Sequence, residues 1–533
     1  MSAEVDVVVA GAGHNGLIAA AYLCRAGYRC RVLDARAIPG GGVASEELLA
    51  PGFRVDSCST GHTLIHTNPL FAADELGIFS EHDLVYVEPD PVAHIVFPDG
   101  ESLTMWLDLE RTCEEIERFS PADARAYRRL LSDYDAVKDV FSRTRFTPVG
   151  FGPSFDELLG DRPQALRWRR RAAMSAWAVV QHEFESRHVR AFMLWMAFQT
   201  AQPVDSAGSG PLAYSIVFGR QRRSWTIPRG GSGELARALV EVIVEAGGEI
   251  LCGRRVRALV LEHGRCVGVE TEDGEQHRAA RAVLSSIHVK DLVAMAPPGA
   301  WGEDFLYCVD TYDAGVSAFA AHYATSEPPR FSAADGSEIT AVSAGVAGWP
   351  QDIVRMGRDV KEGRLVRDGA WLLFPCPTVA DPTRAPAGAH TLKILGMQPY
   401  DPGGGPERWD GELKDEIAAV HLAHLRRAAP NLTAEKILAE LAVSPLDLER
   451  SNPHMWHGTF HGGDRSMSFA GAQRPVPGWA QHRMPIPGLY QTGGTTHPGG
   501  SVTGGPGRNA ALVMLSDLGG ELATGAGDLI MRA

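Results

Sequence analysis

Residues 5–16 read VDVVVAGAGHNG, and this stretch decides the fold of the chain. Its apolar first half is typical of a buried strand, and its glycines follow the pattern G-x-G-x-x-G. An apolar helix pattern comes next and stops at Gly27, and a second strand over 29–33 leads to Asp34. The order strand, glycine loop, helix, strand and acidic residue predicts a dinucleotide-binding unit.

Each residue type in this unit has a physical role. Gly11 allows a tight turn, Gly13 lets the backbone approach a pyrophosphate, and Gly16 lets the helix pack closely on the strand. The helix N-terminus directs positive partial charge at phosphates, and the carboxylate of Asp34 accepts hydrogen bonds from ribose hydroxyls. FAD and NAD both bind such units. A second glycine cluster at 40–42 favours FAD, because this loop can follow an extended cofactor toward a flavin ring.

A further glycine-rich stretch lies near the other end of the chain. Residues 488–511 read GLYQTGGTTHPGGSVTGGPGRNAA, between a strand-like start and an apolar helix pattern over 510–515. Such a loop indicates a backbone that lies directly against another group, with no side chains in between. The sequence therefore places two glycine-rich loops at opposite ends of the chain, and we expect them to meet at one site.

Three stretches resemble the phytoene (carotenoid) desaturase-like FAD-dependent oxidoreductases. The segment 485–511 is similar to the C-terminal signature of these enzymes. The segments 40–59, GGGVASEELLAPGFRVDSCS, and 451–464, SNPHMWHGTFHGGD, look most like one branch of the group. The animal member of that branch is called pyridine nucleotide-disulfide oxidoreductase domain-containing protein 2. The resemblance covers nearly the whole chain in motif order.

This resemblance implies FAD as the cofactor. It also implies that the C-terminal loop closes over the pyrophosphate, and that the following helix N-terminus stabilises negative charge on the reduced flavin. The backbone of Val256 is expected near the adenine. The predicted cofactor-binding residues are Gly11, Gly13, Gly16, Asp34, Ala35, Arg36, Gly40, Gly41, Val256, Gly493, Gly494, Gly500, Val502 and Thr503.

The patterns predict an α/β fold with two domains, as the length of 533 residues also suggests. The FAD-binding domain is predicted to be Rossmann-like and discontinuous, with a parallel sheet that carries an antiparallel hairpin, over 1–75, 222–295 and 485–533. The substrate domain is predicted over 76–221 and 296–484. It should combine a mixed sheet with a helical insertion.

The composition limits the kinds of partner and metal that the protein is expected to bind. The formal net charge is −14, which argues against nucleic acid, because phosphate binding needs a basic field. Eight cysteines show neither C-x-x-C nor zinc-ligand spacing, so no metal is predicted and free thiols in a reducing compartment are expected. No apolar run reaches the roughly 20 residues of a membrane-spanning helix. We expect a cytoplasmic protein, with a peripheral membrane contact left open.

The predicted reaction is dehydrogenation (desaturation) of a C–C bond in an apolar or cyclic substrate, by hydride transfer to flavin N5. The chain has no second G-x-G-x-x-G and no cysteine pair, so electrons should leave to oxygen or to a quinone-like acceptor. His497, inside the C-terminal glycine loop, is the candidate catalytic base. Four other histidines occur in segments that could converge on the site, although structural roles are favoured for them: His62, His66, His457 and His461.

Two other functions stay open at this stage. The first is a flavin amine or alcohol oxidase. Amine recognition by an aromatic cage needs facing aromatic rings, and the loop offers Tyr490 but no Trp or Tyr over 495–503. The second is a flavin-binding interaction protein with little turnover.

Overall fold

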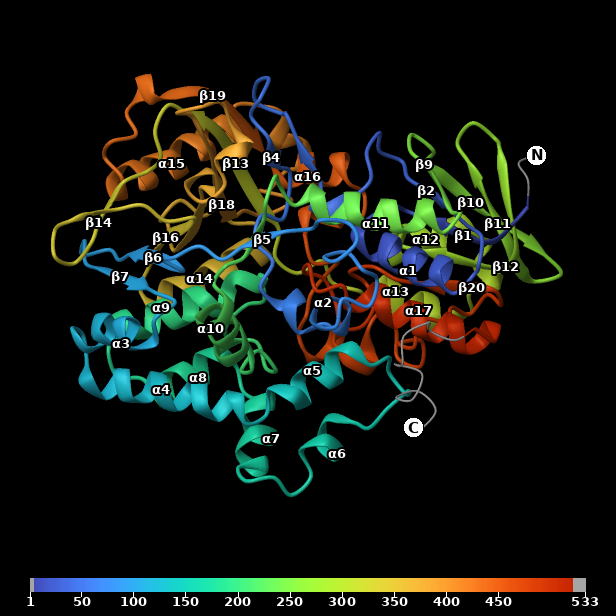
Figure 1. Ribbon diagram of the computed structural model, residues 1–533, viewed down its shortest axis with the longest axis horizontal. Helices are drawn as coiled ribbons and strands as arrows, with labels where there is room; N and C mark the ends of the chain where they lie inside the picture. The colour runs from blue at the N-terminus through green and yellow to red at the C-terminus, as the bar shows by residue number, and fades with distance from the viewer. Residues whose placement is uncertain (1–3, 521–533) are drawn as a thin grey trace.

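The computed structural model describes residues 4–520, which form two seven-stranded sheets surrounded by helices (Figure 1). The strands of the first sheet are β1 (Val5–Ala10), β2 (Cys30–Leu33), β9 (Glu249–Leu251), β10 (Val256–Glu262), β11 (Arg265–Thr271), β12 (Gln276–Ser285) and β20 (Leu489–Gln491). The order β20-β12-β1-β2-β9 is parallel throughout. The first half of β12 pairs instead with the antiparallel hairpin of β10 and β11.

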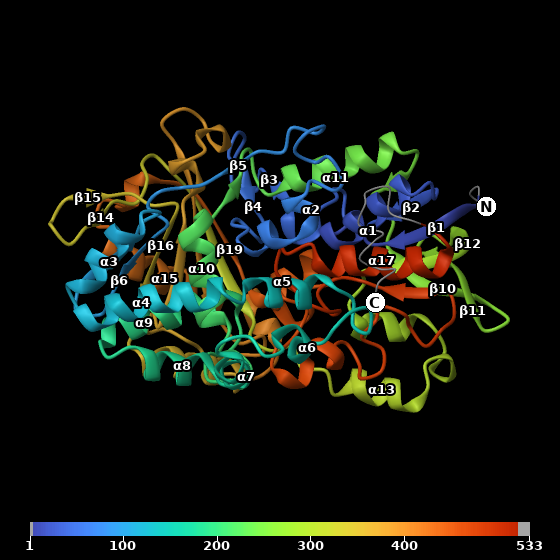
Figure 2. The same ribbon diagram turned by 60° about the horizontal axis from the view of Figure 1, so that its bottom comes forward.

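Helices cover the first sheet on both faces. One face carries α1 (His14–Arg25), α11 (Gly233–Glu245) and α17 (Gly505–Leu518), and the other carries α12 (Val289–Leu292) and α13 (Glu303–Asp310). Val7 and Val9 of β1 point to the first layer, whereas Val8 and Ala10 point to the second. Because both faces are buried, β1 is apolar without alternation. Figure 2 shows α17 alongside α1, which packs against both α17 and α11.

The second sheet is mixed. Its strands are β6 (Ala93–Val96), β7 (Ser102–Met105), β13 (Ala318–Thr325), β16 (Ser343–Ala347), β17 (Trp371–Pro375), β18 (His390–Met397) and β19 (Ile437–Val443). They run in the order β19-β13-β18-β17-β16-β6-β7. Neighbouring strands are antiparallel except for β16 and β6, which are parallel.

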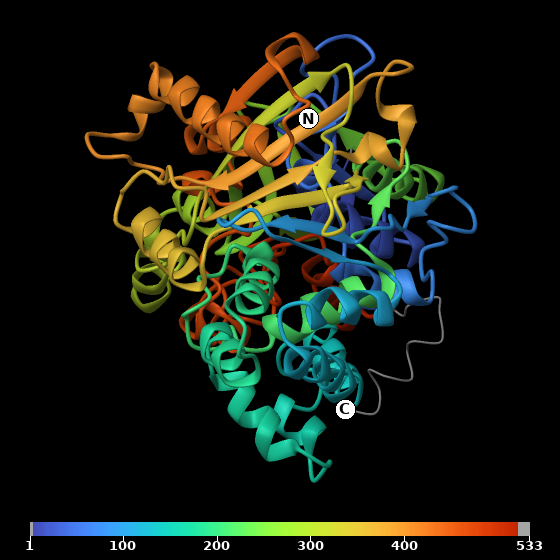
Figure 3. The same cartoon turned by 90° about the vertical axis from the view of Figure 1, so that its left-hand side faces the viewer.

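This sheet also lies between two helical layers, seen above and below its strands in Figure 3. One layer contains α15 (Leu413–Ala428), and α16 (Pro445–Ser451) follows β19. The other contains α14 (Pro350–Lys361) and the helical segment α3 (Leu109–Glu117), α4 (Pro121–Asp135), α5 (Lys138–Phe146), α6 (Phe155–Leu159), α7 (Ala165–Ala173), α8 (Ala176–Glu183), α9 (Arg187–Ala197) and α10 (Leu212–Arg223). Short elements complete the fold: β3 (Ser45–Glu46), β4 (Val55–Asp56), β5 (Tyr86–Val87), β8 (Ile227–Pro228), β14 (Phe331–Ser332), β15 (Glu338–Ile339) and α2 (Pro69–Ala72).

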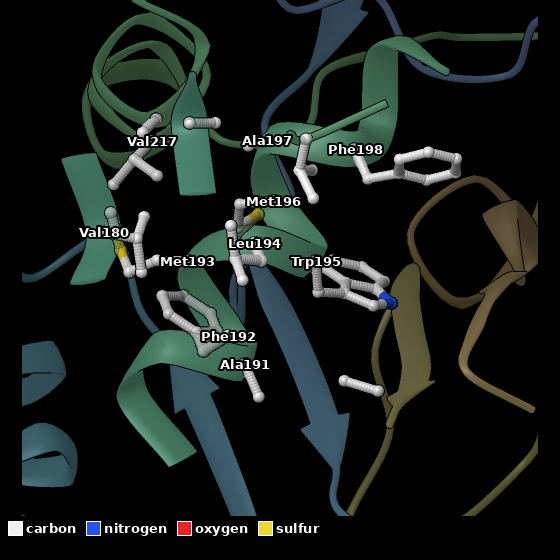
Figure 4. Close-up of a cluster of buried hydrophobic side chains, with 14 of the residues drawn as sticks. Val180, Ala191, Phe192, Met193, Leu194, Trp195, Met196, Ala197, Phe198 and Val217 are labelled. Atoms are coloured by element: carbon white, nitrogen blue, oxygen red, sulfur yellow. The ribbon is translucent and has the colours of Figure 1, made fainter. Parts of the chain in front are cut away.

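The helix α9 is enclosed by its neighbours, so residues 191–197 are all buried although they point in every direction around the helix (Figure 4). Two indole groups fix it to the second sheet. Nε1 of Trp195 donates to the carbonyl oxygen of Leu372 at 3.2 Å, and Nε1 of Trp371 donates to the carbonyl oxygen of Trp195 at 3.0 Å. The C-terminal end of α9 is thereby held at the sheet.

The predicted fold class is confirmed: a Rossmann-like parallel sheet with an antiparallel hairpin stands beside a mixed sheet with a helical insertion. The exact domain boundaries stay a prediction. Among residues 4–520, no helix has both the length and the apolar character that crossing a bilayer requires.

A buried ion cluster joins segments that are far apart in the chain. Arg384 Nη1 lies 2.6 Å from Asp56 Oδ2, its Nε lies 2.9 Å from Asp381 Oδ2, and all three side chains are at most 1% exposed. Asp56 also accepts from the hydroxyl of Ser45 and from the backbone N–H of Ser232. Burial raises the pKa of Asp56, but the charges of Arg384 and Lys393 and these hydrogen bonds outweigh it, so the pKa is lowered overall.

We expect Arg384→Met to destabilise the protein by about 3–5 kcal/mol, because it leaves two buried carboxylates without their cation. The control is Arg355→Met, which removes a side chain that is 51% exposed and pairs with Asp352 and Asp368 at the surface. The control substitution should lower the free energy of unfolding by less than about 1 kcal/mol. Chemical unfolding of both variants measures the difference, and equal losses would show that the cluster does not stabilise the fold.

Candidate active site

A cavity of about 550 Å³ lies where the two sheets and the C-terminal segment meet. One end is formed by the loop at the start of α1, the end of β2 and the start of β10. The other end is formed by β13, β17 and β18 of the second sheet, together with α10 and with Gln199 and Thr200, which follow α9. Residues 452–455 and 460–461 and the loops at 493–494 and 500–502 close the side between them.

The cavity brings together twelve of the fourteen residues that the sequence predicts to bind the cofactor. They are Gly11, Gly13, Gly16, Asp34, Ala35, Arg36, Gly41, Val256, Gly493, Gly494, Gly500 and Val502. The other two, Gly40 and Thr503, stand behind this lining. The N–H of Gly40 donates to the carbonyl oxygen of Ala12, and the hydroxyl of Thr503 accepts from the N–H of Gly505.

The first glycine loop fits a dinucleotide because of where Cβ atoms would lie. A Cβ at Gly11 would stand 2.1 Å from Ser286 Oγ, and one at Gly16 would stand 2.2 Å from the carbonyl oxygen of Gly11. These two glycines are needed for packing. A Cβ at Gly13 would meet no protein atom within 4 Å, and Gly13 lines the cavity. The protein thus leaves space at Gly13 for a ligand that touches the backbone.

The electrostatics at this point suit a pyrophosphate. Gly13 is the N-cap of α1 and supplies no capping side chain, so N–H groups of the first turn are left for another partner. The N-terminus of α17 lies beside it, since the N–H of Gly507 donates to Oδ1 of Asn15 at 3.2 Å. Two helix N-termini therefore direct positive partial charge to one region.

Asp34 is held in place by the backbone. Its Oδ2 accepts from the N–H of Ala12 at 2.7 Å, and its Oδ1 accepts from the N–H of Arg36 at 2.8 Å. Burial raises the pKa of Asp34, although these two hydrogen bonds and the charge of Arg36 act in the opposite direction. Each carboxylate oxygen keeps acceptor capacity toward the cavity, which fits a ribose with its hydroxyl donors.

The C-terminal glycine loop is fixed by one buried and one partly buried side chain that the sequence did not single out. Arg474, 1% exposed, donates to the carbonyl oxygens of five residues, namely His461, Gly462, Asp464, Phe469 and Gly494. His454 bridges two segments, because its Nδ1 donates to the carbonyl oxygen of Ser286 at 2.8 Å and its Nε2 accepts from the N–H of Gly494 at 3.0 Å. The only sequence signal for His454 is its place in the 451–464 motif.

Burial lowers the pKa of His454 to about 4, with a further contribution from the charge of Arg474. The ring is therefore neutral at pH 7, as its role of donor through one nitrogen and acceptor through the other requires.

The structure does not place His497 in the cavity lining, so it does not support His497 as the catalytic base. Nε2 of His497 lies 2.9 Å from the carbonyl oxygen of Thr144 in α5, and burial lowers its pKa to about 4. The nearby loop instead turns Gly500 toward residue 461, where a Cβ would stand 2.3 Å from the His461 carbonyl oxygen. A histidine inside the loop can thus point away from the site that the loop forms.

Of the other candidate histidines, His461 reaches the cavity, and neither of its ring nitrogens has a hydrogen-bond partner. Burial lowers its pKa well below the ordinary value, so the ring is neutral. The remaining three have structural contacts outside the lining: His62 bonds Tyr86, His66 bonds Thr226, and His457 stacks on Tyr400.

The second-sheet end of the cavity is mostly apolar. Its apolar lining residues are Ile216, Trp225, Ala318, Ala320, Leu373, Leu395 and Phe460. Two cationic side chains also reach it. Lys393 Nζ donates to the carbonyl oxygen of Cys58 at 2.7 Å and to Oγ1 of Thr60 at 3.2 Å, and burial lowers its pKa. The second cation is Arg220 on α10.

Carboxylates line only the opposite end of this cavity within residues 4–520. These are Asp34, after β2, and Asp291, in α12. The glycine-loop end therefore carries both signs of charge, because Arg36, Arg254 and Arg255 line it as well, whereas the charged side chains at the second-sheet end are cationic.

Residues 16–507 match the family described as flavin containing amine oxidoreductase. The chain belongs to this family. It is an FAD-dependent oxidoreductase, and the predicted cofactor is confirmed. The cavity agrees with this assignment through the open space at Gly13, the uncapped N-terminus of α1 and the acceptor oxygens of Asp34.

The relatives extend over almost the whole chain. A limonene dehydrogenase subunit of Castellaniella defragrans is 29% identical, across 97% of this chain and 95% of the relative. The mouse (Mus musculus) pyridine nucleotide-disulfide oxidoreductase domain-containing protein 2 is 28% identical, across 97% and 94%. The lycopene-forming phytoene desaturase of Pseudescherichia vulneris is 26% identical, across 96% and 99%. The predicted resemblance to the phytoene desaturase-like enzymes and to this branch is confirmed.

Solved structures agree with the fold. The crystal structure of an oxidoreductase from Methanosarcina mazei superposes with a TM-score of 0.62 at 17% identity, covering 96% of this chain and all of that one.

We expect Gly13→Ala to fold normally but to lose most of its bound FAD, because the new methyl group meets no protein atom and projects where the cofactor approaches. Gly299→Ala is the matched control, since a Cβ there also meets nothing within 4 Å and the position lies outside the cavity lining. The flavin absorbance per protein and the thermal unfolding of the apoproteins measure the two effects. Full FAD content in Gly13→Ala would contradict the assignment of this space.

His454 gives a pH prediction. Its pKa in the folded protein, about 4, lies below the ordinary 6.5, so from pH 6.5 down to 4 the unfolded state binds a proton that the folded state does not. Its contribution to stability is therefore complete above pH 6.5 and is lost as the pH falls. Between pH 4 and 6.5 we expect the unfolding free energy of His454→Gln to change less steeply with pH than that of the wild type. The difference in slope should correspond to at most about one proton. Parallel pH profiles for the variant and the wild type would refute the bridging, neutral histidine.

Proposed function

We propose that this enzyme dehydrogenates a C–C bond of an apolar, cyclic or polyunsaturated substrate. The observation that carries the proposal is the second-sheet end of the cavity, whose walls are apolar and whose charged side chains are cations. Such walls suit a hydrocarbon body. The names of two relatives, a limonene dehydrogenase and a phytoene desaturase, support the same substrate class.

When bound, FAD supplies the hydride acceptor, its N5 atom. The residues of the chain do the rest. The glycine loops at 11–16 and 493–494 would hold the cofactor on rigid backbone, and α1 would bind the pyrophosphate through its N-terminus. The apolar walls of β13, β17 and β18 exclude water and orient the C–H bond.

The proton that leaves the substrate needs a basic atom at this end of the cavity. The unpaired ring nitrogens of neutral His461 can take it. We propose His461 in place of His497.

Oxygen or a quinone-like molecule is the proposed electron acceptor. The chain carries one G-x-G-x-x-G sequence, and all eight cysteines, which lie within the described residues, are free thiols. Of these thiols only Cys58 lines the cavity. Free thiols also support the proposed location in a reducing compartment, the cytoplasm.

Amine oxidation is the second candidate, because the family is described by that reaction. The charges of the cavity oppose it. A protonated amine would add positive charge to a region that already holds Lys393 and Arg220, and the described part of the cavity has no carboxylate there to pair with it. Tyr490 cannot form an aromatic cage, since its hydroxyl donates to Asp517 outside the lining.

We expect the flavin band of the purified protein, at about 450 nm, to bleach under anaerobic conditions with members of a panel of cyclic alkenes, cyclic ketones and polyenes. Amines of matched size should leave it unchanged, and free FAD with the same compounds is the control. Bleaching by amines alone would establish the oxidase. No bleaching with any compound would favour the interaction protein with little turnover.

A further inference from the structure

Arg220 is a buried cation that faces the substrate end of the cavity. It lies in α10 one turn after Ile216, and both line the cavity. The residue is 1% exposed, and burial lowers its pKa to about 9. Its surroundings come from α9, β16 and the segment after α10, not from the glycine loops that hold the cofactor.

The contacts of Arg220 are few and weak. Nη2 donates to Oε1 of Gln199 at 3.2 Å, and Nη1 lies 3.5 Å from Oγ of Ser343 and 3.6 Å from Sδ of Met196. The guanidinium carbon stands 5.3 Å from the centre of the Trp225 ring. Nε of Arg220 has no partner, and neither does Nε2 of Gln199 beside it.

Within residues 4–520, no carboxylate lies within ion-pair distance of Arg220. Three other buried arginines within residues 4–520 have close partners, either carboxylates or carbonyl oxygens. Arg384 contacts two aspartates, Arg508 contacts Glu75, and Arg474 donates to five carbonyl oxygens. A buried cation without a counter-ion is costly, so its retention in a cavity wall calls for a partner that enters the cavity.

We propose that Arg220, with Gln199, binds a carboxylate carried by the substrate. The unpaired Nε and the weakly bonded Nη groups form the planar fork that suits two carboxylate oxygens, and the free amide of Gln199 adds a third donor. The inference rests on the proposed function and makes it more specific. The substrate is then an apolar ring or polyene with one acid group, which anchors it while the hydrocarbon part lies toward the glycine loops.

The test compares neutral and acidic forms of one skeleton. The probes are perillic acid, its methyl ester and perillyl alcohol, and a longer set of retinoic acid, methyl retinoate and retinol. Calorimetric titration of the FAD-loaded protein at pH 7.5 measures their affinities. We expect the acid of at least one set to bind roughly 10- to 100-fold tighter than its ester and alcohol, as a charged hydrogen-bonded pair provides.

The variants identify the residue. Arg220→Met should lower the affinity for the acid to that for its ester. Arg220→Lys should keep part of the preference for the acid. Arg222→Met is the matched control, two residues along the same helix, with a side chain that is 65% exposed and paired with Asp135 at the surface. It should leave the preference unchanged. FAD content and thermal unfolding confirm that each variant is folded.

An absence of acid preference in both probe sets would overturn the inference, and so would a preference that survives in Arg220→Met. If Arg220→Met fails to fold, two measurements still test the inference. They are the ratio of the affinities for acid and ester in the wild type, and the reduction of this ratio in Arg220→Lys. Binding needs no turnover, so this test is separate from the proposed reaction. If neutral alkenes bleach the flavin but the protein does not bind the acids more tightly, only the carboxylate inference fails. If the acids bind more tightly but no compound bleaches the flavin, only the proposed reaction fails.

Discussion

The steric contact between the first glycine loop and the ends of two strands is the constraint on which the site depends. Gly11 touches Ser286 at the end of β12, and Gly16 touches the carbonyl of Gly11, with no room for a Cβ at either position. This contact holds the N-terminus of α1 over the ends of β1 and β2. The same loop fixes Asp34, whose Oδ2 accepts from the N–H of Ala12. The proposed phosphate and ribose sites thus follow from one packing arrangement.

The C-terminal loop reaches comparable rigidity by a different route. It has little regular secondary structure between β20 and α17, and its order comes from side chains that donate to backbone carbonyls. Arg474 and His454 both contact Gly494, one through its carbonyl oxygen and the other through its N–H. A loop held at both backbone groups keeps its dipoles oriented without help from the ligand, which is the condition for electrostatic preorganisation.

The sequence was sufficient where function depends on backbone conformation. Gly11, Gly13 and Asp34 belong to a local motif whose spacing carries the geometry, so the nucleotide end of the site could be predicted. His454 could not be predicted from the same kind of reasoning, because its partner Ser286 is 168 residues away. For His497 the structure shows a contact with Thr144 and no place in the cavity lining, because proximity in sequence to the glycine loop does not determine where a side chain points.

Arg220 shows why the substrate end was the hardest part to predict. In the sequence it stands beside Arg222 and Arg223 at the end of an apolar helix, where a run of basic residues is typical of a solvated helix end. Only the packing of α10 against α9 and the second sheet separates the buried Arg220 from its exposed neighbour Arg222. Burial of a charge depends on long-range contacts that no local pattern encodes.

The distribution of charge in the cavity runs against that of the whole protein. The chain is acidic, with a formal net charge of −14, yet the charged side chains at the second-sheet end are Lys393 and Arg220. A hydrocarbon body offers few groups by which an enzyme can fix its orientation. An anchor at one end, away from the reacting C–H bond, supplies binding energy that positions the bond against the flavin. Apolar walls with a cationic end therefore combine into one mode of substrate recognition, in which the walls select the body and the cation sets its direction.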